Sequence, residues 1–142
     1  MAVDYSTGVR IGMLDAIETA IGAGPVLRFY SGTKPGKCSD ASTGTLLASI
    51  TLTGDFMSGA SAAGNVVTKA KNPASTWSAQ ATTGGVIGYY RIYDSGQTTC
   101  HEQGTVTATG GGGDITIDNT AVALNQTITI TSKTITAGNA GV

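Results

Sequence analysis

The sequence predicts a mainly β fold: an antiparallel sandwich or barrel of about eight short strands, jelly-roll-like, with one N-terminal helix. The 142 residues include 23 threonines, 21 glycines and 18 alanines, which suits closely packed strands joined by tight turns. Apolar residues recur at helical spacing only before Pro25, and short alternating runs separated by turn residues follow it. We expect a single domain, with an N-terminal arm and helix at 1–24 and a β body at 25–142.

The helix is expected at residues 7–21. Ser6 or Thr7 can cap its first turn, and a Gly-Ala-Gly-Pro run ends it. Asp15 and Glu18 fall off the apolar stripe, so we expect them to point toward water or a partner. The stripe consists of residues three and four apart, which lie on one helix face: Ile11, Leu14, Ile17 and Ile21.

Eight strands are expected in the body, because β-branched and aromatic runs alternate with Gly, Pro, Asn and Asp. Their ranges are 26–31, 45–53, 65–71, 76–82, 86–94, 98–106, 114–118 and 126–137. A hairpin turn at Ser95 and Gly96 joins two of them. In the loop at 54–64, Phe56 and Met57 are expected to plug the core.

Side-chain alternation predicts which way each strand faces. In the second strand one face carries Leu46, Ala48, Ile50 and Leu52. In the strand at 86–94, Val86, Tyr90 and Ile92 oppose Ile87, Tyr89 and Tyr93, so it is covered on both sides or lies at an interface. In the last strand the Thr/Ile phase slips between Ile130 and Ile135, which predicts a bulge or a turn near Ser132 and Lys133.

Charge and hydropathy argue against several classes of partner. The formal net charge is -1, and the eight Lys and Arg residues are scattered, so we expect no nucleic-acid binding. No apolar run approaches the roughly 20 residues that cross a bilayer, so we expect no membrane span. The first ten residues have no apolar segment, so we expect no secretory signal and a protein that stays in a cytoplasm or leaves inside a particle.

Few residues are suited to catalysis. His101 is the single histidine, and alternation places it on the sheet face opposite Cys100, so we expect a surface histidine. Ser61 lacks the GxSxG frame of a nucleophile elbow. Five aspartates are expected to bond nearby backbone amides at turns: Asp40, Asp55, Asp94, Asp114 and Asp118. We therefore expect no enzyme, no catalytic residue, no cofactor and no metal.

Three further features have more than one interpretation. Cys38 and Cys100 are two thiols that can be neighbours, or a disulfide formed after release from a reducing cytoplasm. The glycine run at 110–113 lacks a GK[ST] ending, which favours a hinge or flexible loop over a phosphate loop. Trp77 with Tyr89, Tyr90 and Tyr93 could stack on sugars, but core packing and intersubunit contact are favoured.

Three stretches together resemble a family of small virion proteins of tailed bacteriophages. They are YSTGVRIGMLDAIETAIGAGPVLRFYSGTKP (5–35), GVIGYYRIYDSGQTTCHEQGTV (85–106) and ITIDNTAVALNQTITITSKTITAGNA (115–140). Residues 54–84 match least well. Gln97 and Asn125 stand where the family pattern has glycine.

The resemblance implies a structural protein of the virion, assembled in the host cytoplasm, that cements or decorates the capsid shell. It implies contacts with the major capsid protein or other virion proteins, and a homo-oligomer such as a trimer. The alternative is a neck, collar or tail-fibre component, including a receptor- or glycan-binding module. The arm and helix would clamp a neighbour, and the candidate interface residues are Tyr5, Leu14, Ile17, Ile21, Trp77, Tyr89 and Tyr93.

Overall fold

The computed structural model describes residues 3–137. Residues 1–2 of the expected arm and residues 138–142, which include the end of the C-terminal motif, lie outside that range. The elements are α1 (Thr7–Ile21), β1 (Val26–Ser31), β2 (Leu46–Thr51), β3 (Ser61–Ala63), β4 (Val66–Ala70), β5 (Ser78–Gln80), β6 (Gly85–Tyr93), β7 (Cys100–Ala108), β8 (Ile115–Ile117), β9 (Ala121–Val122) and β10 (Thr127–Ala137). The prediction of a mainly β protein with one N-terminal helix is confirmed.

The strands form one open, mixed sheet. Its order is β2-β1-β6-β7-β8-β10-β4-β3, while β5 pairs with β10 and β9 with β6. All described pairs are antiparallel except β7 and β8, which run parallel. The pairing path does not return from β3 to β2, so the sheet of residues 3–137 is open and shows no barrel or jelly roll.

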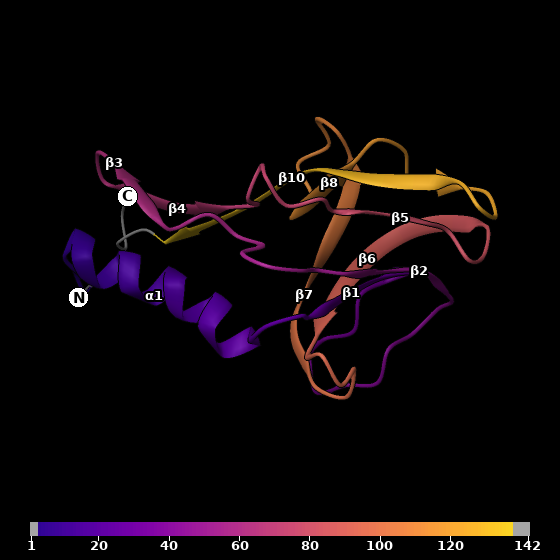
Figure 1. Cartoon of the computed structure of the whole chain (residues 1–142), viewed down its shortest axis with the longest axis horizontal. Coiled ribbons are helices and arrows are strands. Elements are labelled where there is room, and N and C mark those ends of the chain that lie inside the picture. The colour runs from indigo at the N-terminus through magenta and orange to yellow at the C-terminus, as the bar shows by residue number, and fades with distance from the viewer. Residues whose placement is uncertain (1–2, 138–142) are drawn as a thin grey trace.

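The sheet encloses one main core, and the helix lies at one end of it. In Figure 1, α1 lies beneath β4 and the C-terminal half of β10, while β1, β2, β6 and β7 form the opposite part of the molecule. Phe56 and Met57 are buried in the core as predicted, 2% and 3% exposed. No helix in the described part of the chain is long and apolar enough to span a membrane.

A bulge in β2 changes the predicted facing of two leucines. Pairing with β1 passes from Phe29–Ala48 to Tyr30–Leu46, so Leu47 is an extra residue in its strand. Leu47 is therefore buried in the core with Ala48 and Ile50, and Leu46, predicted to share their face, is 36% exposed. Regular alternation cannot predict this, because one added residue reverses every side chain beyond it.

A second bulge lies in β6 at Gly88. The register passes from Tyr30–Tyr89 to Ser31–Ile87, so Gly88 is skipped. Ile87 consequently joins Tyr90 and Ile92 in the core, the place predicted for Val86, and Val86 is 60% exposed. A Cβ atom at Gly88 would lie 2.0 Å from the backbone oxygen of Gly32, so this bulge requires glycine.

The predicted phase slip in the last strand is confirmed as a bulge. Thr131 is skipped where β10 pairs with β8, one residue before the predicted position. Along its length β10 pairs successively with β5, β8 and β4. The strand therefore connects the main core to the part of the sheet that carries the helix.

Two of the four residues in the glycine run lie close to Thr107. The run lies between β7 and β8, where the chain turns back so that Val106 pairs with Ile115 in parallel register. Cβ atoms at Gly111 and Gly113 would lie 2.7 and 2.8 Å from atoms of Thr107. Glycine is favoured at Gly111 and Gly113 by this close approach, and at Gly110 and Gly112 by their positive φ of 88° and 79°.

Two turn residues adopt a backbone conformation typical of glycine. Gln97 has φ 60° and Asn125 has φ 66°, and no other described residue except glycine has a positive φ. These are the two positions at which the family pattern has glycine. Asparagine tolerates this left-handed region better than most side chains do.

Candidate functional site: the docked helix and its outward face

The helix begins and ends as the sequence predicts. The Ser6 hydroxyl accepts a hydrogen bond from the Val9 amide at 3.3 Å, and Gly22 ends the helix with φ 84°. Leu14 and Ile21 are buried, and Ile17 is half-buried against the core. The apolar stripe therefore packs on the body of its own chain.

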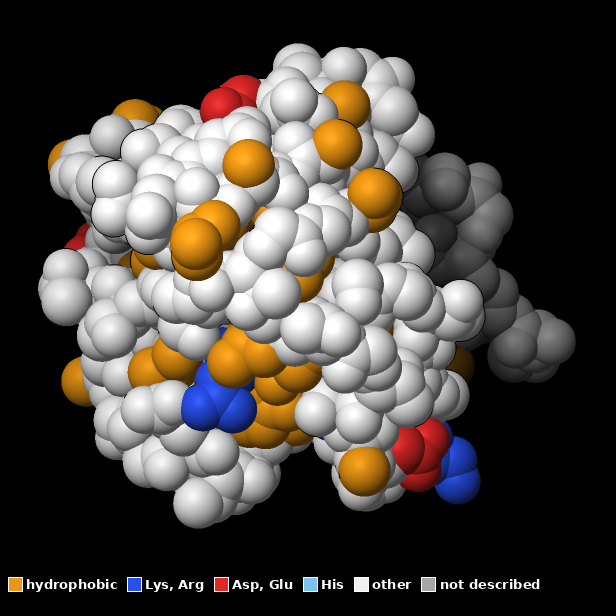
Figure 2. Space-filling view, turned by 90° about the vertical axis from the view of Figure 1, so that its right-hand side faces the viewer, with side chains coloured by type: hydrophobic (Ala, Val, Ile, Leu, Met, Phe, Trp, Pro, Cys, Tyr) orange, Lys and Arg blue, Asp and Glu red, His pale blue; other side chains and the backbone are white. Residues whose placement is uncertain are grey.

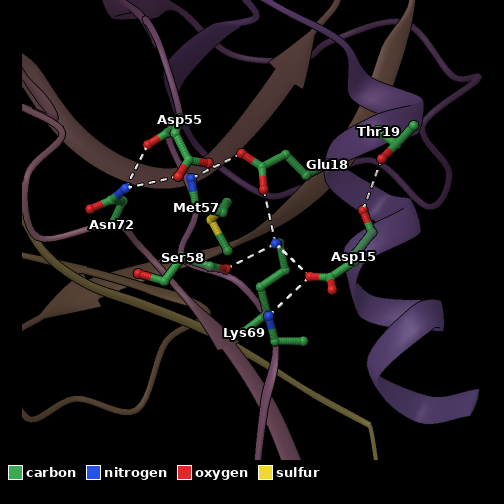
Figure 3. Close-up of polar contacts among 9 residues, drawn as sticks. Asp15, Glu18, Thr19, Asp55, Met57, Ser58, Lys69 and Asn72 are labelled. Atoms are coloured by element: carbon green, nitrogen blue, oxygen red, sulfur yellow. Dashed lines mark hydrogen bonds and ion pairs between the residues drawn. The ribbon is translucent and has the colours of Figure 1, made fainter. Parts of the chain in front are cut away.

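A buried lysine from β4 binds both acidic residues of the helix (Figure 3). Lys69 is 2% exposed, and its Nζ lies 2.9 Å from Asp15 Oδ1, 2.8 Å from Glu18 Oε2 and 2.9 Å from the Ser58 backbone oxygen. These three acceptors match the three donors of an ammonium group. The charge of Lys69 is thus compensated where it is shielded from water.

The same carboxylates also bind the loop that precedes β3. Glu18 accepts a hydrogen bond from the Met57 amide at 3.1 Å, and Asp15 accepts one from the Ala60 amide at 2.9 Å. The Ala60 amide and then Lys69 hold the pKa of Asp15 below its ordinary value. Burial acts to lower the pKa of Lys69, but its hydrogen bonds to Glu18 and Asp15 outweigh this and raise it.

The prediction that Asp15 and Glu18 point toward water or a partner was wrong for their main contacts. The prediction rested on their position around the helix relative to the apolar stripe. Their partner, Lys69, lies 51 or more positions later in the sequence, and no local pattern indicates that it is buried beside them. The third charged residue of the helix, Arg10, also turns inward. It is 3% exposed and donates to the backbone oxygens of Asn65 and Ala137, the latter at 3.5 Å.

With its three charges directed at the body, α1 presents an uncharged surface to the outside. We call this surface the outer helix face. Val9 is 49% exposed and Met13 50% exposed, four positions apart and so on the same side. The outer helix face consists of Gly8, Val9, Gly12, Met13, Ala16 and Ala20, all exposed. An ordinary surface helix shows the opposite arrangement, with its charges toward water.

The arm before the helix extends this apolar surface. Val3 is 63% exposed and Tyr5 44% exposed. Together with Val9 and Met13 they are half of the large apolar side chains that are exposed among residues 3–137. The other four are Leu46, Val66, Val86 and Leu124.

A second polar cluster lies in a hollow of about 430 Å³ between β7 and the C-terminal half of β10. Lys133 is 3% exposed, pairs with Glu102 and donates to the Tyr90 hydroxyl at 2.9 Å, while Tyr90 donates to Glu102. Burial, reinforced by the charge of Glu102, raises the pKa of Tyr90 far above its ordinary value. Because the three groups bind one another, they link β6, β7 and β10.

His101 borders this hollow and is exposed. Tyr93 pairs with Cys100 and Ile92 with Glu102, so His101 is the extra residue of a bulge. Cys100 borders a different hollow, and the predicted separation of the two side chains onto opposite faces is confirmed.

Four of the five aspartates predicted to bond backbone amides do so, and Asp55 instead accepts from the side-chain amide of Asn72. Asp94 accepts from the amides of Thr98 and Thr99 at 2.8 and 3.1 Å, and these bonds lower its pKa. Asp40 accepts from the Lys37 amide at 2.9 Å and Asp55 from Asn72 Nδ2 at 3.3 Å. Asp114 accepts from the Thr105 amide at 2.8 Å and Asp118 from the Thr129 amide at 3.3 Å. Within residues 3–137 no three His, Cys, Asp or Glu side chains are grouped to hold a metal ion.

The aromatic residues are packed inside the chain. Trp77 is 2% exposed and contacts Phe56, with ring centroids 6.4 Å apart. Tyr89 stacks on Tyr30 at 5.2 Å on the other sheet face. Of the predicted interface residues, Tyr5 is exposed and Ile17 half-buried, and the others are buried by the chain itself: Leu14, Ile21, Trp77, Tyr89 and Tyr93.

Five of the seven predicted interface residues are therefore covered by the chain itself, and on the helix this is because the apolar stripe faces the body. The outer helix face was missed, although a signal for it exists in the sequence. Between Thr7 and Ile21 the charged residues are confined to Arg10, Asp15 and Glu18, which leaves one side of the helix without charge. Comparison of the chain with protein-family models, with curated proteins and with solved structures gave no match.

Proposed function

We propose that this chain is a structural protein of a tailed-bacteriophage virion, which cements or decorates the capsid shell through contacts made by the outer helix face and the arm. The observation that carries the proposal is the orientation of α1. Its charged side chains Arg10, Asp15 and Glu18 bind the body, and its exposed side carries Val9 and Met13. A helix with this orientation gains free energy when another protein covers it.

The gain from each copy is modest and suits an assembly with many copies. Covering the exposed half of Val9 and of Met13 contributes about 1 kcal/mol each. An ordinary interface of about 800 Å² per partner needs further contacts, which Tyr5 and Val3 can supply. In a shell, many weak contacts made at once give firm attachment.

The ionisable groups support a structural role over an enzymatic one. Lys69, Lys133 and Arg10 are buried and bound within the chain. The carboxylates that pair with the two lysines are partly exposed, but they too are bound within the chain. Figure 2, which views the end of the molecule away from α1, shows a surface made mostly of neutral groups with few charges. Such a surface suits contact with the major capsid protein or with copies of this chain.

The three motifs that resemble phage virion proteins support the virion as the location. A neck, collar or fibre position would use the same kind of contact at a lower copy number. The glycan-binding form of that alternative loses its main support, because Trp77 is 2% exposed and offers no stacking surface.

The proposal is tested by adding one charge to the outer helix face. Met13→Glu should abolish incorporation into particles of the phage that encodes the chain, while the purified protein keeps its melting temperature. Thr83→Glu adds the same charge to an exposed turn away from the helix and should be incorporated normally. Normal incorporation of Met13→Glu, or absence of the wild-type chain from purified particles, would refute the proposal.

A further inference from the structure

Two cysteines far apart in the sequence lie together on the outer face of the sheet. Cys38 belongs to the segment between β1 and β2, residues 32–45, which we call the covering loop, and Cys100 begins β7. Both line a hollow of about 590 Å³, together with Arg91 and Tyr93. Each is partly exposed, and the Cys100 thiol donates to the Glu102 backbone oxygen at 3.3 Å. The nearby Cys38 thiol helps to raise the pKa of Cys100.

The covering loop is held in place on both sides of Cys38. Arg91, 2% exposed, donates to the backbone oxygen of Lys37 at 3.1 Å and to that of Asp40 at 2.9 Å. Gln103 accepts from Arg91 at 2.9 Å and donates to the Pro35 backbone oxygen at 2.7 Å. Because Arg91 and Gln103 project from β6 and β7, the loop is fixed to the strand that carries Cys100.

Farther along, the loop is held by a tyrosine. The Tyr89 hydroxyl donates to the Thr43 backbone oxygen at 2.5 Å and accepts from the Thr43 amide at 2.9 Å. The folded chain therefore holds the two thiols together before any bond forms between them, and little conformational entropy remains to be lost when they join.

We propose that Cys38 and Cys100 form a reversible intramolecular disulfide when the folded protein meets a low-molecular-weight disulfide such as oxidised glutathione. The proposal goes beyond the virion role and does not depend on it.

The exchange proceeds in two balanced steps. The Cys38 thiolate attacks one sulfur of oxidised glutathione, and the displaced glutathione thiolate takes up a proton. Cys100 then loses its proton and attacks the Cys38 sulfur, which releases the second glutathione. The protein is oxidised by two electrons, and one disulfide is reduced to two thiols. Burial, and then the contact with Cys38, raises the pKa of Cys100 to about 12, which fits Cys38 as the first nucleophile.

The bond would fasten the covering loop to β7. Because the two cysteines are 62 positions apart, the disulfide would link distant parts of the chain. It would thereby lower the conformational entropy of the unfolded state. We expect the melting temperature of the oxidised protein to exceed that of the reduced protein by roughly 10 °C. A protein made in a reducing cytoplasm would thus become more stable on reaching an oxidising medium.

The test uses the full chain, folded, with oxidised glutathione at micromolar protein concentration. Alkylation of remaining thiols followed by mass spectrometry should show loss of two hydrogen atoms and no alkylation. Peptide mapping should find Cys38 linked to Cys100, and reduction should reverse both the bond and the rise in melting temperature.

Single variants provide the controls. Cys38→Ser and Cys100→Ser should each give only glutathione adducts or covalent dimers, with no rise in melting temperature. The proposal is overturned if both wild-type thiols stay open to alkylation, if the disulfide links different molecules, or if it forms only in denaturant.

Discussion

Removing the charge of Lys69 should separate the contribution of the ion pairs under α1 from that of the apolar stripe. Lys69→Met keeps most of the length and apolar contacts of the side chain but leaves the carboxylates of Asp15 and Glu18 without their shared cation. Each carboxylate retains one bond to a backbone amide.

The magnitude follows from how far the partners are exposed. Breaking a buried ion pair costs about 3–5 kcal/mol, because a buried charge is left uncompensated. The Lys69 side chain is 3% exposed, but that of Glu18 is 20% and that of Asp15 44% exposed, so water partly compensates them. We therefore expect the free energy of unfolding to fall by about 2–3 kcal/mol, and the melting temperature by about 10 °C.

Urea denaturation monitored by circular dichroism measures this change in the free energy of unfolding. Two further variants show how much of it comes from the ion pairs. Lys71→Met is the control, because the Lys71 ammonium binds the Ser75 backbone oxygen and the Trp77 ring and pairs with no carboxylate in residues 3–137. Its free energy of unfolding should fall by about 1 kcal/mol or less. Adding Asp15→Asn and Glu18→Gln to Lys69→Met should restore much of the lost stability, because no unpaired charge remains. A loss below about 1 kcal/mol for Lys69→Met, or further destabilisation by the added amides, would refute the reasoning.

Three other predictions concern single positions. Gly88→Ala should lower the free energy of unfolding by at least about 2 kcal/mol, because its Cβ would lie 2.0 Å from the Gly32 oxygen. An unchanged free energy of unfolding in a denaturant titration would contradict the bulge. Asn125→Gly should raise stability by about 0.5 kcal/mol and Asn125→Val should lower it, because φ is 66°; equal effects would argue against that geometry. Under reducing conditions, the pKa of Cys100 is raised from 9.0 to about 12, so the folded state keeps a proton that the unfolded chain loses. The resulting stabilisation is complete below pH 9 and is lost as the pH rises toward 12. Cys100→Ser should show a smaller alkaline loss than wild type in thermal melts, and an identical profile would count against the burial of this thiol.

The sequence predicted the elements whose signals are local. The helix was placed correctly because Ser6 and Gly22 mark its ends. Each of the eight predicted strands corresponds to a strand of the structure, but β3, which lies in the predicted loop, and β9 were not predicted. The bulge in β10 was also predicted, since a change of phase in a Thr/Ile run is visible in the sequence itself.

What failed depended on contacts between distant segments. The bulges at Leu47 and Gly88 leave no mark on local alternation, because they arise from how β1 pairs with each neighbour. The parallel pair of β7 and β8 was unexpected because parallel strands rarely follow so short a connection. The inward orientation of Asp15 was unexpected because it depends on Lys69 being buried on another element.

The residues predicted for an interface on the helix belong to its apolar stripe, and the structure buries two of them, Leu14 and Ile21, against the body. Tyr5 of the arm, which was also predicted, is exposed. In most helices the apolar side is the one that makes contact, and here the body already covers it. The remaining uncharged side, with Val9 and Met13, is the surface left for a partner.

The central claim, that this chain acts by attaching to a capsid through the outer helix face, is tested most directly by counting its copies in purified virions. Quantitative mass spectrometry against the major capsid protein should find hundreds of copies per particle for wild type and almost none for Met13→Glu. A wild-type count of about a dozen would place the chain at the neck or in fibres, and its absence from particles would contradict the account altogether.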